Sequence, residues 1–88
     1  MTPQHDPDHR RFTLPTTPTS MLDYELGSSH VVFTHTVVPA AYQGQGLAAR
    51  LVEAGLAWAR EQGLKVVPAC SYVNAYIKRH PEWQNLVA

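Results

Sequence analysis

The residues best suited to chemistry in this sequence are two glycines in the hexapeptide Gln43-Gly44-Gln45-Gly46-Leu47-Ala48. Glycines at this spacing, between a strand and the first turn of a helix, let backbone N–H groups converge on an anion without interference from Cβ atoms. The helix dipole adds partial positive charge at the same point. Phosphate oxygens are therefore the predicted ligand. The alternative is a plain tight turn, in which the glycines only assist entry into the helix.

The glycine spacing excludes two common nucleotide-binding patterns. A dinucleotide fingerprint needs a third glycine, as Gly-x-Gly-x-x-Gly, but the turn continues with Leu47-Ala48-Ala49. A P-loop needs a Gly-Lys-Ser/Thr sequence, and none follows. The predicted phosphate therefore belongs to another class of ligand.

Composition narrows the class of protein. The chain has 88 residues, enough for one domain, with 44% apolar residues and seven basic residues that balance seven acidic ones. Because no Lys/Arg cluster matches a phosphate backbone or an anionic lipid surface, we expect neither nucleic acid nor membrane as a partner. No apolar stretch approaches the roughly 20 residues that span a bilayer, and the polar N-terminus has no signal-peptide core. We therefore expect a cytoplasmic protein.

No metal site is expected. Cys70 is the only cysteine, so the chain has neither an internal disulfide nor the ligands of a cysteine-based zinc site. His5 and His9 have i, i+4 spacing, but the prolines and aspartates around them disfavour a helix. Residues 1–10 are therefore interpreted as a flexible leader, and residues 11–88 as the folded domain.

Three strands are predicted before the glycine turn, over Arg11 to Leu14, Met21 to Leu26 and Val31 to Val38. The last is the clearest, because it is rich in β-branched residues. The connections are short and rich in turn formers, as in Thr16-Thr17-Pro18-Thr19-Ser20. Antiparallel pairing of the three strands follows from these short connections.

A helix and a fourth strand follow the glycine turn. Apolar residues recur at helical spacing from about Gly46 to Gln62, and Gly63 is a C-terminal stop. Leu64 to Val67 is a compact apolar run, so strand, helix and strand predict a right-handed βαβ crossover and a parallel pair. A second helix over about Tyr72 to Arg79 ends before Pro81. The predicted fold class is α/β, with a mixed sheet of three antiparallel strands, the crossover and the second helix.

The hexapeptide resembles the Gln/Arg-x-x-Gly-x-Gly/Ala signature of the GNAT superfamily of N-acetyltransferases. There it follows a strand that ends in Val-x-Pro or similar, as Val37-Val38-Pro39 does here. Further segments look like those of the minimal GNAT-like subgroup and occur in the same order: His35-Thr36-Val37-Val38-Pro39, Gly63-Leu64-Lys65-Val66-Val67-Pro68, Cys70, Tyr76-Ile77 and Arg79-His80-Pro81-Glu82-Trp83. The resemblance covers nearly everything from Arg11 to Val87, and it implies a compact GNAT-like domain that uses acetyl-CoA.

The resemblance also implies where acetyl-CoA, the donor, binds. It would lie in a split between the strand that ends at Val38 and the strand that starts near Leu64. The pantetheine arm would pair with the backbone of Thr36, Val37 and Val38. The pyrophosphate would rest on the amides of the glycine turn, which are those of Gln43, Gly44, Gln45, Gly46, Leu47, Ala48 and Ala49. A mixed sheet with a βαβ unit independently favours a ligand beyond the C-terminal ends of its parallel strands.

Two residues near the second helix are candidates for the chemistry. Acetyl transfer from a thioester to an amine needs a proton for the leaving thiolate. Tyr76-Ile77-Lys78 resembles the Tyr-x-Lys/Arg element whose tyrosine donates that proton in larger GNAT enzymes. Cys70 lies near a helix N-terminus, where a thiolate is favoured, and the subgroup carries a cysteine there, so an acetylated Cys70 is one hypothesis. The structural alternatives are Tyr76 as a packing residue and Cys70 as a small buried thiol.

The general base is less obvious, because Val37 replaces the glutamate of the subgroup's His-Thr-Glu-Val sequence. Side chains alternate along a strand, so His35 and Val37 share a face. His35 is the only group on that face that titrates near neutrality, which makes it the candidate base. A structural role for His35, with water or the substrate itself as base, is the alternative.

The acceptor is predicted only as an amine, either a small molecule or a peptide-like one. Larger GNAT enzymes place helices between their first strands to shape the acceptor pocket, but only Thr16 to Ser20 lies there in this chain, so we expect an open acceptor side. Two other functions stay open, a CoA-binding module with little or no turnover and a small interaction domain whose glycine turn binds nothing. The sequence shows no specific interface, so the oligomeric state also stays open.

Overall fold

The computed structural model describes residues 1–88 and contains one five-stranded sheet in the order β1-β2-β3-β4-β5. Its strands are β1 (Gln4–Asp6), β2 (Arg11–Leu14), β3 (Ser20–Leu26), β4 (His30–Val37) and β5 (Lys65–Pro68). Neighbours from β1 to β4 pair antiparallel, whereas β4 and β5 pair in parallel. The predicted mixed sheet with a βαβ crossover is therefore confirmed, with the bounds of the expected strands shifted by at most one residue.

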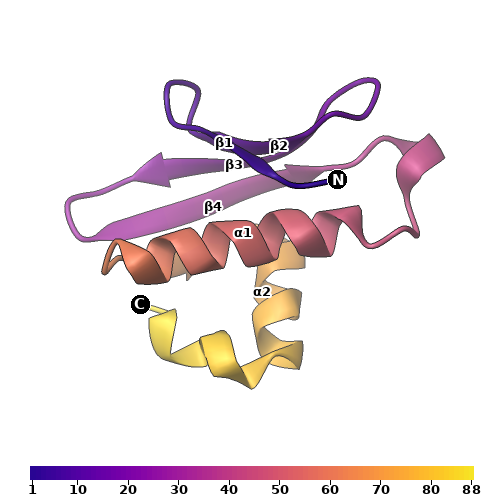
Figure 1. The fold of residues 1–88 in the computed structure, drawn as a ribbon. Helices are drawn as coiled ribbons and strands as arrows, with labels where there is room; N and C mark the ends of the chain where they lie inside the picture. Colours follow the sequence, from indigo (N-terminus) through magenta and orange to yellow (C-terminus); the bar gives the residue numbers. More distant parts are fainter.

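Two helices, α1 (Leu47–Glu61) and α2 (Ser71–Arg79), lie on the same side of this sheet (Figure 1). Short 3-10 helices precede α1 (η1, Ala40–Tyr42) and follow α2 (η2, Pro81–Leu86). A single cluster of 17 buried hydrophobic residues joins the inner face of the sheet to the helices. The opposite face of the sheet carries no helix. Neither α1 nor α2 has the length and apolar composition needed to cross a membrane.

A glycine lets α1 approach the sheet closely. Gly55 is buried in the middle of the helix, and a Cβ added there would lie 3.0 Å from Leu22 Cδ2 and 3.0 Å from Phe33 Cε1. Contacts this short cannot form unless the neighbouring side chains move. A larger side chain in place of Gly55 would therefore push α1 away from the sheet. The close approach fixes the height of α1 over β3 and β4, and with it the position of the glycine turn at the start of the helix.

The C-terminal end of α1 returns the chain into the sheet. The N–H of Leu64 donates to the carbonyl of Ala59 at 2.9 Å, and the N–H of Gly63 donates to the carbonyl of Arg60 at 3.2 Å. These two bonds form a Schellman motif, which requires the left-handed conformation that Gly63 adopts with φ of 68°. The predicted stop at Gly63 is confirmed, and β5 begins two residues later.

A bulge in β4 decides which side chains face the helices. The register between β3 and β4 shifts by one residue after Asp23, which leaves Thr34 without a partner. An extra residue of this kind turns the following side chains to the opposite face. Phe33 before the bulge and Thr36 after it therefore both face the helices, whereas His35 faces the uncovered side of the sheet.

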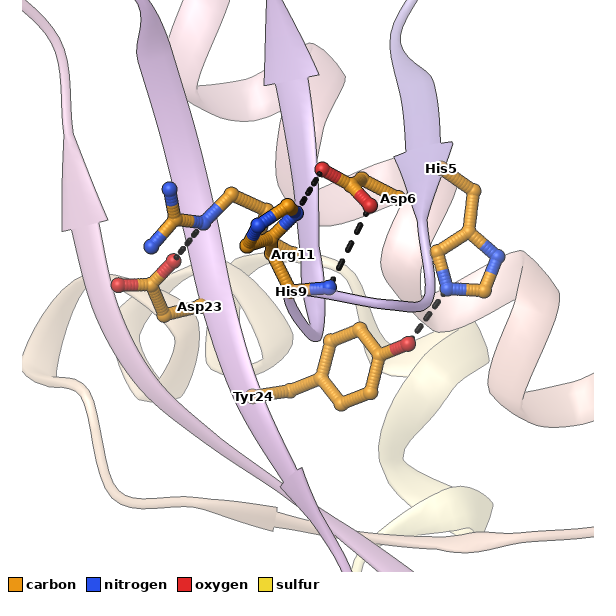
Figure 2. A network of polar contacts seen from close by, with 6 residues as sticks. All are labelled: His5, Asp6, His9, Arg11, Asp23 and Tyr24. Carbon is orange, nitrogen blue, oxygen red and sulfur yellow. Dashed lines mark hydrogen bonds and ion pairs between the residues drawn. The ribbon is translucent and has the colours of Figure 1, made fainter.

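Residues 1–10 are not a flexible leader, so that prediction is wrong. Gln4–Asp6 forms the edge strand β1, which pairs with β2. The imidazole of His5 stacks on Phe12 with ring centroids 4.3 Å apart, and its Nε2 lies 2.6 Å from the Tyr24 hydroxyl (Figure 2). These tertiary contacts hold a strand whose own residues are all polar, which is why the sequence alone gives no strand signal there.

Two ion pairs lie on the same part of the sheet (Figure 2). His9 Nδ1 is 2.9 Å from Asp6 Oδ2, and Arg11 Nε donates to Asp23 Oδ1 at 3.0 Å. The contact with His9 lowers the pKa of the Asp6 carboxyl. Both pairs are solvent-accessible, so each contributes little to the free energy of unfolding. No three His, Cys, Asp or Glu side chains come together in a way that could hold a metal ion.

Candidate functional site

The glycine turn has the geometry of an anion cradle. Gly44 and Gly46 adopt φ values of 83° and 76°, the left-handed conformation that residues with a Cβ rarely tolerate. A Cβ added to either glycine meets no atom within 4 Å, so both face open space. Gly46 is also the N-cap of α1 and has no side chain to occupy the first N–H groups of the helix. Those N–H groups are therefore available to an anion.

Gln43 fixes this turn to the end of β4. Its side-chain Nε2 donates to the carbonyl of Val38 at 3.0 Å. The preceding 3-10 turn is closed by a bond of 2.9 Å from the N–H of Tyr42 to the carbonyl of Pro39. The first residue of the hexapeptide thus has a positioning role, because it holds the glycines against the strand instead of reaching toward a ligand.

A cavity of about 400 Å³ opens over the turn. Its volume falls within the roughly 300–1,000 Å³ of small-molecule sites. One end lies at the glycine turn and the other at the end of β4. The residues that line it are Thr36, Val38, Tyr42, Gln43, Gly44, Gly46, Leu47, Ala48 and Tyr72. None of these side chains carries a full charge at neutral pH, so backbone amides and the α1 dipole provide the attraction for an anion.

Beside the cavity, β5 leaves β4. Their parallel pairing ends at Phe33 and Pro68. Pro68 has no N–H to continue the ladder, and the N–H of Ala69 turns back to the carbonyl of Val67 at 3.0 Å. The N–H of Cys70 still donates to the carbonyl of Phe33 at 2.9 Å. Residues 35–37 consequently pair with β3 alone, and their other edge is free for a ligand with amide groups.

The thiol of Cys70 lies across this split. Its Sγ is 3.4 Å from Thr36 Oγ1, one of the groups that line the cavity. Desolvation by burial raises the pKa of the Cys70 thiol, but the Thr36 hydroxyl and the N–H groups of Val73 and Tyr72 outweigh it, so the pKa is lower than its ordinary value. The N–H groups of Val73 and Tyr72 stabilise the thiolate through their dipoles, because neither forms a helix-capping hydrogen bond to the Cys70 sulfur. The local field favours a thiolate at this position.

Most of the predicted donor-binding residues surround the cavity. The exceptions are Val37, Gln45 and Ala49, whose side chains do not line it. Val37 is 49% exposed and follows His35 on the outer face of β4. The proposed role of these three residues depends on their backbone, so donor contacts by them stay a prediction.

Tyr76 is placed away from the cavity. Its side chain is only 8% exposed, and its hydroxyl donates to Glu53 Oε2 on α1 at 3.3 Å. The ring stacks on His80 with centroids 4.1 Å apart. Burial, followed by the charge of Glu53, raises the pKa of Tyr76. Tyr76 therefore joins α1 to α2 and does not line the cavity, so its role as proton donor stays a prediction.

His35 is also absent from the cavity lining. It is exposed on the uncovered face of the sheet, where its partner across the strands is Asp23. The expected shared face of His35 and Val37 is correct, but the bulge at Thr34 turns that face away from the helices. His35 can reach a ligand only from the uncovered side of the split.

Two tyrosines that line the cavity were missed by sequence reasoning. Tyr42 immediately precedes the glycine turn, and Tyr72 lies in the first turn of α2. The available signal was position, because each tyrosine lies in the segment just beyond one of the two strands that flank the split, β4 or β5. Tyr72 is 40% exposed, whereas Val73, Tyr76 and Ile77 of the same helix are buried.

Comparison with known proteins agrees with this geometry. The sequence model of a family described as GCN5-related N-acetyl-transferase matches residues 11–86, which include β2 to η2. The chain belongs to this family. The match spans the glycine turn, the split between β4 and β5, and Cys70, so all residues that line the cavity lie within the matched region.

Three similar proteins share one name. Protein NATD1 of Gallus gallus is 37% identical over 82 residues, covering 89% of this chain and 74% of that protein. Protein NATD1 of Homo sapiens is 37% identical over 82 residues, covering 89% of this chain and 73% of that protein. Protein NATD1 of Danio rerio is 32% identical over 87 residues, covering 94% of this chain and 79% of that protein. Membership of the family thus rests on nearly the whole chain.

Proposed function

We propose that this protein is a cytoplasmic N-acetyltransferase that transfers an acetyl group from acetyl-CoA to an amine. The observation that carries the proposal is the continuity of the cavity from the glycine turn to the unpaired edge of β4. A ligand with a pyrophosphate at one end and an amide-containing arm at the other matches both ends. Membership of the GCN5-related family supports the same donor.

The residues present fit such a donor. An anion at the turn meets the amides of Gly44 and Gly46, where the lack of Cβ atoms leaves room for phosphate oxygens. An arm that follows the free edge of residues 34–37 leads toward Thr36. Its thioester would then lie near the Thr36 hydroxyl and the Cys70 thiol, which are 3.4 Å apart.

The acceptor would enter from the uncovered face of the sheet. No helix follows β2, since only residues 15–19 separate it from β3, so nothing shapes a closed acceptor pocket there. His35 lies on that face, where it would take a proton from the incoming amine. This arrangement suits an exposed amine, on a small molecule or on a peptide.

A CoA-binding module with little turnover is the second candidate function. It is favoured by one observation, namely that no histidine, carboxylate or amine side chain lines the cavity. The only titratable side chains there are those of Tyr42 and Tyr72. A base is then available only outside the cavity, at His35 or in the substrate.

Two measurements separate these functions. A donor that binds only the folded chain, at a free concentration about 100 times its dissociation constant, adds about 2.7 kcal/mol to the free energy of unfolding. Both functions therefore predict that CoA and acetyl-CoA raise the melting temperature. Only the transferase predicts amine-dependent release of free CoA thiol, assayed with polyamines, aminosugars, aromatic amines and lysine peptides. Stabilisation without turnover for any amine would favour the binding module, and no stabilisation at millimolar CoA would exclude both.

The role of Cys70 is tested separately by intact-protein mass spectrometry after incubation with acetyl-CoA. A mass increase of one acetyl group that is absent from Cys70→Ala would place an acetyl-cysteine on the route. An unmodified protein that still turns over an amine would assign direct transfer, with Cys70 positioned beside the thioester. Cys70→Ser keeps a small polar group and serves as the matched variant for loss of the sulfur alone.

A further inference from the structure

Val37 lies on the uncovered face of the sheet, beside the end of the cavity where the thioester would lie. Thr36, the residue before it, lines the cavity, whereas Val37 does not. Side chains alternate along a strand, so Val37 projects from the opposite face of β4, where 49% of it is exposed. An amine that reaches the thioester from the uncovered face therefore passes over Val37.

The residue opposite Val37 is also apolar. Met21 of β3 is its partner in the antiparallel register. Met21 is half-buried between the buried Ser20 and Leu22, so it lies on the uncovered face together with Val37. Directly opposite side chains have Cβ atoms about 4.5–5.5 Å apart, so the two form one apolar surface, the Val37–Met21 pair. The next residue across the sheet, Thr13, carries no charge either.

The carboxylates of this face leave the Val37–Met21 pair without a free negative charge. Asp23 of β3 accepts a hydrogen bond from Arg11 Nε at 3.0 Å, so its charge is compensated (Figure 2). Asp6 lies on β1, which two strands separate from β4. Glu25 pairs with the first half of β4, on the other side of the bulge. A second positive charge on the acceptor would therefore find no unpaired carboxylate beside the pair.

We propose that the acceptor is a primary amine on a hydrocarbon or aromatic group without a second positive charge, and that Val37 determines this specificity. The inference rests on the proposed acetyl transfer. In that transfer the amine nitrogen forms a bond to the thioester carbonyl carbon, and the carbon–sulfur bond breaks with its electron pair on sulfur. The proton lost by the nitrogen reaches that sulfur through His35 and solvent, so that amide and CoA thiol are the products.

Two effects favour an apolar acceptor. While the amine nitrogen is at the thioester, the first carbons of its chain would lie over the Val37–Met21 pair, and each methylene that leaves water there stabilises the complex. An ammonium group further along the chain would lose part of its hydration beside the same side chains without an ionic partner in return. The apolar surface thus attracts the chain and rejects a second charge.

Steady-state kinetics with a series of amines test the acceptor class. In the wild-type protein kcat/KM should rise by about two- to fourfold for each methylene from propylamine to hexylamine, where fourfold corresponds to complete burial of the methylene. Hexylamine should exceed 1,6-diaminohexane by about tenfold or more, although both present the same reacting group on the same chain. Release of CoA thiol at saturating acetyl-CoA is the assay.

Substitutions of Val37 test whether this residue determines the preference. Val37→Thr keeps the branched shape but replaces a methyl group by a hydroxyl, and should reduce the gain in kcat/KM to less than about twofold for each methylene. Val37→Glu places a carboxylate beside the chain, and should lower the preference for hexylamine over 1,6-diaminohexane by about tenfold or more. Val32→Thr is the matched control, because it makes the same change on the same strand and face but before the bulge, and should keep both wild-type preferences. Circular dichroism checks that each variant is folded.

The outcomes separate this inference from the proposed function. If 1,6-diaminohexane or a lysine peptide is acetylated as fast as hexylamine or faster, the acceptor class is wrong and acetyl transfer stands. If hexylamine is preferred but both variants of Val37 keep the wild-type selectivity, the role of Val37 is overturned. An equal loss of selectivity in Val32→Thr would overturn that role as well, because the effect would not be local to the split. A protein that acetylates no amine would overturn both proposals.

Discussion

The two halves of β4 have opposite surroundings. Residues 31–33 pair with β3 on one side and β5 on the other, and both Val31 and Phe33 are fully buried. Residues 35–37, beyond the bulge at Thr34, pair with β3 alone, and the side chains of His35 and Val37 are exposed. One strand therefore contributes to the core with its first half and offers a free backbone edge to a ligand with its second.

The difference shows how a very small domain makes room for a site without opening its core. The junction between the halves combines the bulge at Thr34 with the end of the ladder at Pro68. The bulge turns Thr36 toward the helices, and the departure of β5 leaves the strand edge beside it unpaired. Only eight residues of strand are needed for both roles, which predicts that substitutions in the two halves have separable effects on stability and on ligand binding.

The largest effect is expected at Phe33 in the buried half. Phe33→Ala removes a ring that packs against Tyr24 and Gly55, and should lower the free energy of unfolding by about 3–5 kcal/mol. Thr36→Ala, in the second half, should cost less than about 1 kcal/mol. Urea unfolding followed by tryptophan fluorescence measures both. Equal losses of unfolding free energy in the two variants would mean that both halves of β4 contribute equally to stability.

The next effect concerns two glycines with the same backbone conformation. Gly46, with φ of 76°, lies in the cavity, and Gly63, with φ of 68°, ends α1. Replacement by alanine should destabilise the fold at either position by about 1–2 kcal/mol, the cost of a left-handed residue with a Cβ. Only Gly46→Ala should weaken acetyl-CoA binding, by about tenfold or more, because its Cβ enters the space of the phosphates.

Calorimetric titration of acetyl-CoA into the two folded variants makes this comparison direct. Gly63→Ala controls for strain, since it adds the same atom in the same conformation with the same open surroundings. If both variants bind as the wild-type protein does, the turn does not hold the phosphates and the cavity has another occupant. If both lose binding equally, the loss comes from the stability of α1.

Much of this architecture was visible in the sequence because it depends on local signals. The β-branched run of β4, the helical period of α1 and the stop at Gly63 each follow from neighbouring residues. The glycine turn was also predictable, because its positive φ values demand glycine. The positions of Tyr72 and Tyr76 were not, because both lie on α2 and only its docking on α1 decides which one faces the cavity.

The bulge and the first strand were hidden for a different reason. Nothing in the sequence around Thr34 marks an extra residue, since the shift exists only in the register with β3. The residues of β1 are polar and are held by a ring stack with Phe12 and by Tyr24. Tertiary contacts of this kind override local propensity. The candidate base His35 was therefore placed on the correct strand, but the bulge that turns its side chain away from the cavity was not predictable.

A smaller effect, on the reactivity of the Cys70 thiol, is expected from a substitution near the junction of the two halves of β4. Thr36→Val removes the hydroxyl that lies 3.4 Å from the Cys70 sulfur and helps to hold its pKa down. The pKa of the Cys70 thiol should rise, so the rate of alkylation by iodoacetamide at pH 7 should fall by about two- to tenfold. Thr34→Val is the control, because it removes a hydroxyl that donates to the carbonyl of Asp23 at 3.3 Å instead of contacting Cys70. A rate that is unchanged in Thr36→Val would show that the N–H groups of α2 alone set the reactivity.

The smallest effect is expected far from β4, at the edge strand β1. Burial lowers the pKa of His5 despite the nearby charge of Asp6, so the neutral ring is the form that stacks on Phe12. Because the folded-state pKa is lower than the unfolded one, the contribution of His5 is complete above the ordinary value near 6.5 and is lost as pH falls through the folded pKa. The stability involved is small, because the ring is partly solvated.

Amide exchange at two pH values tests whether this loss stays local. Residues of β1 should lose protection at pH 5 relative to pH 7.5, after correction for intrinsic exchange rates, while amides of residues 30–33 keep theirs. His5→Phe retains a ring that can stack on Phe12 without a titrating group, and should remove the pH dependence of β1. Persistent pH dependence in that variant would show that His5 is not the group that titrates. Simultaneous loss of protection in β4 would show instead that the edge strand and the buried half of β4 unfold as one unit.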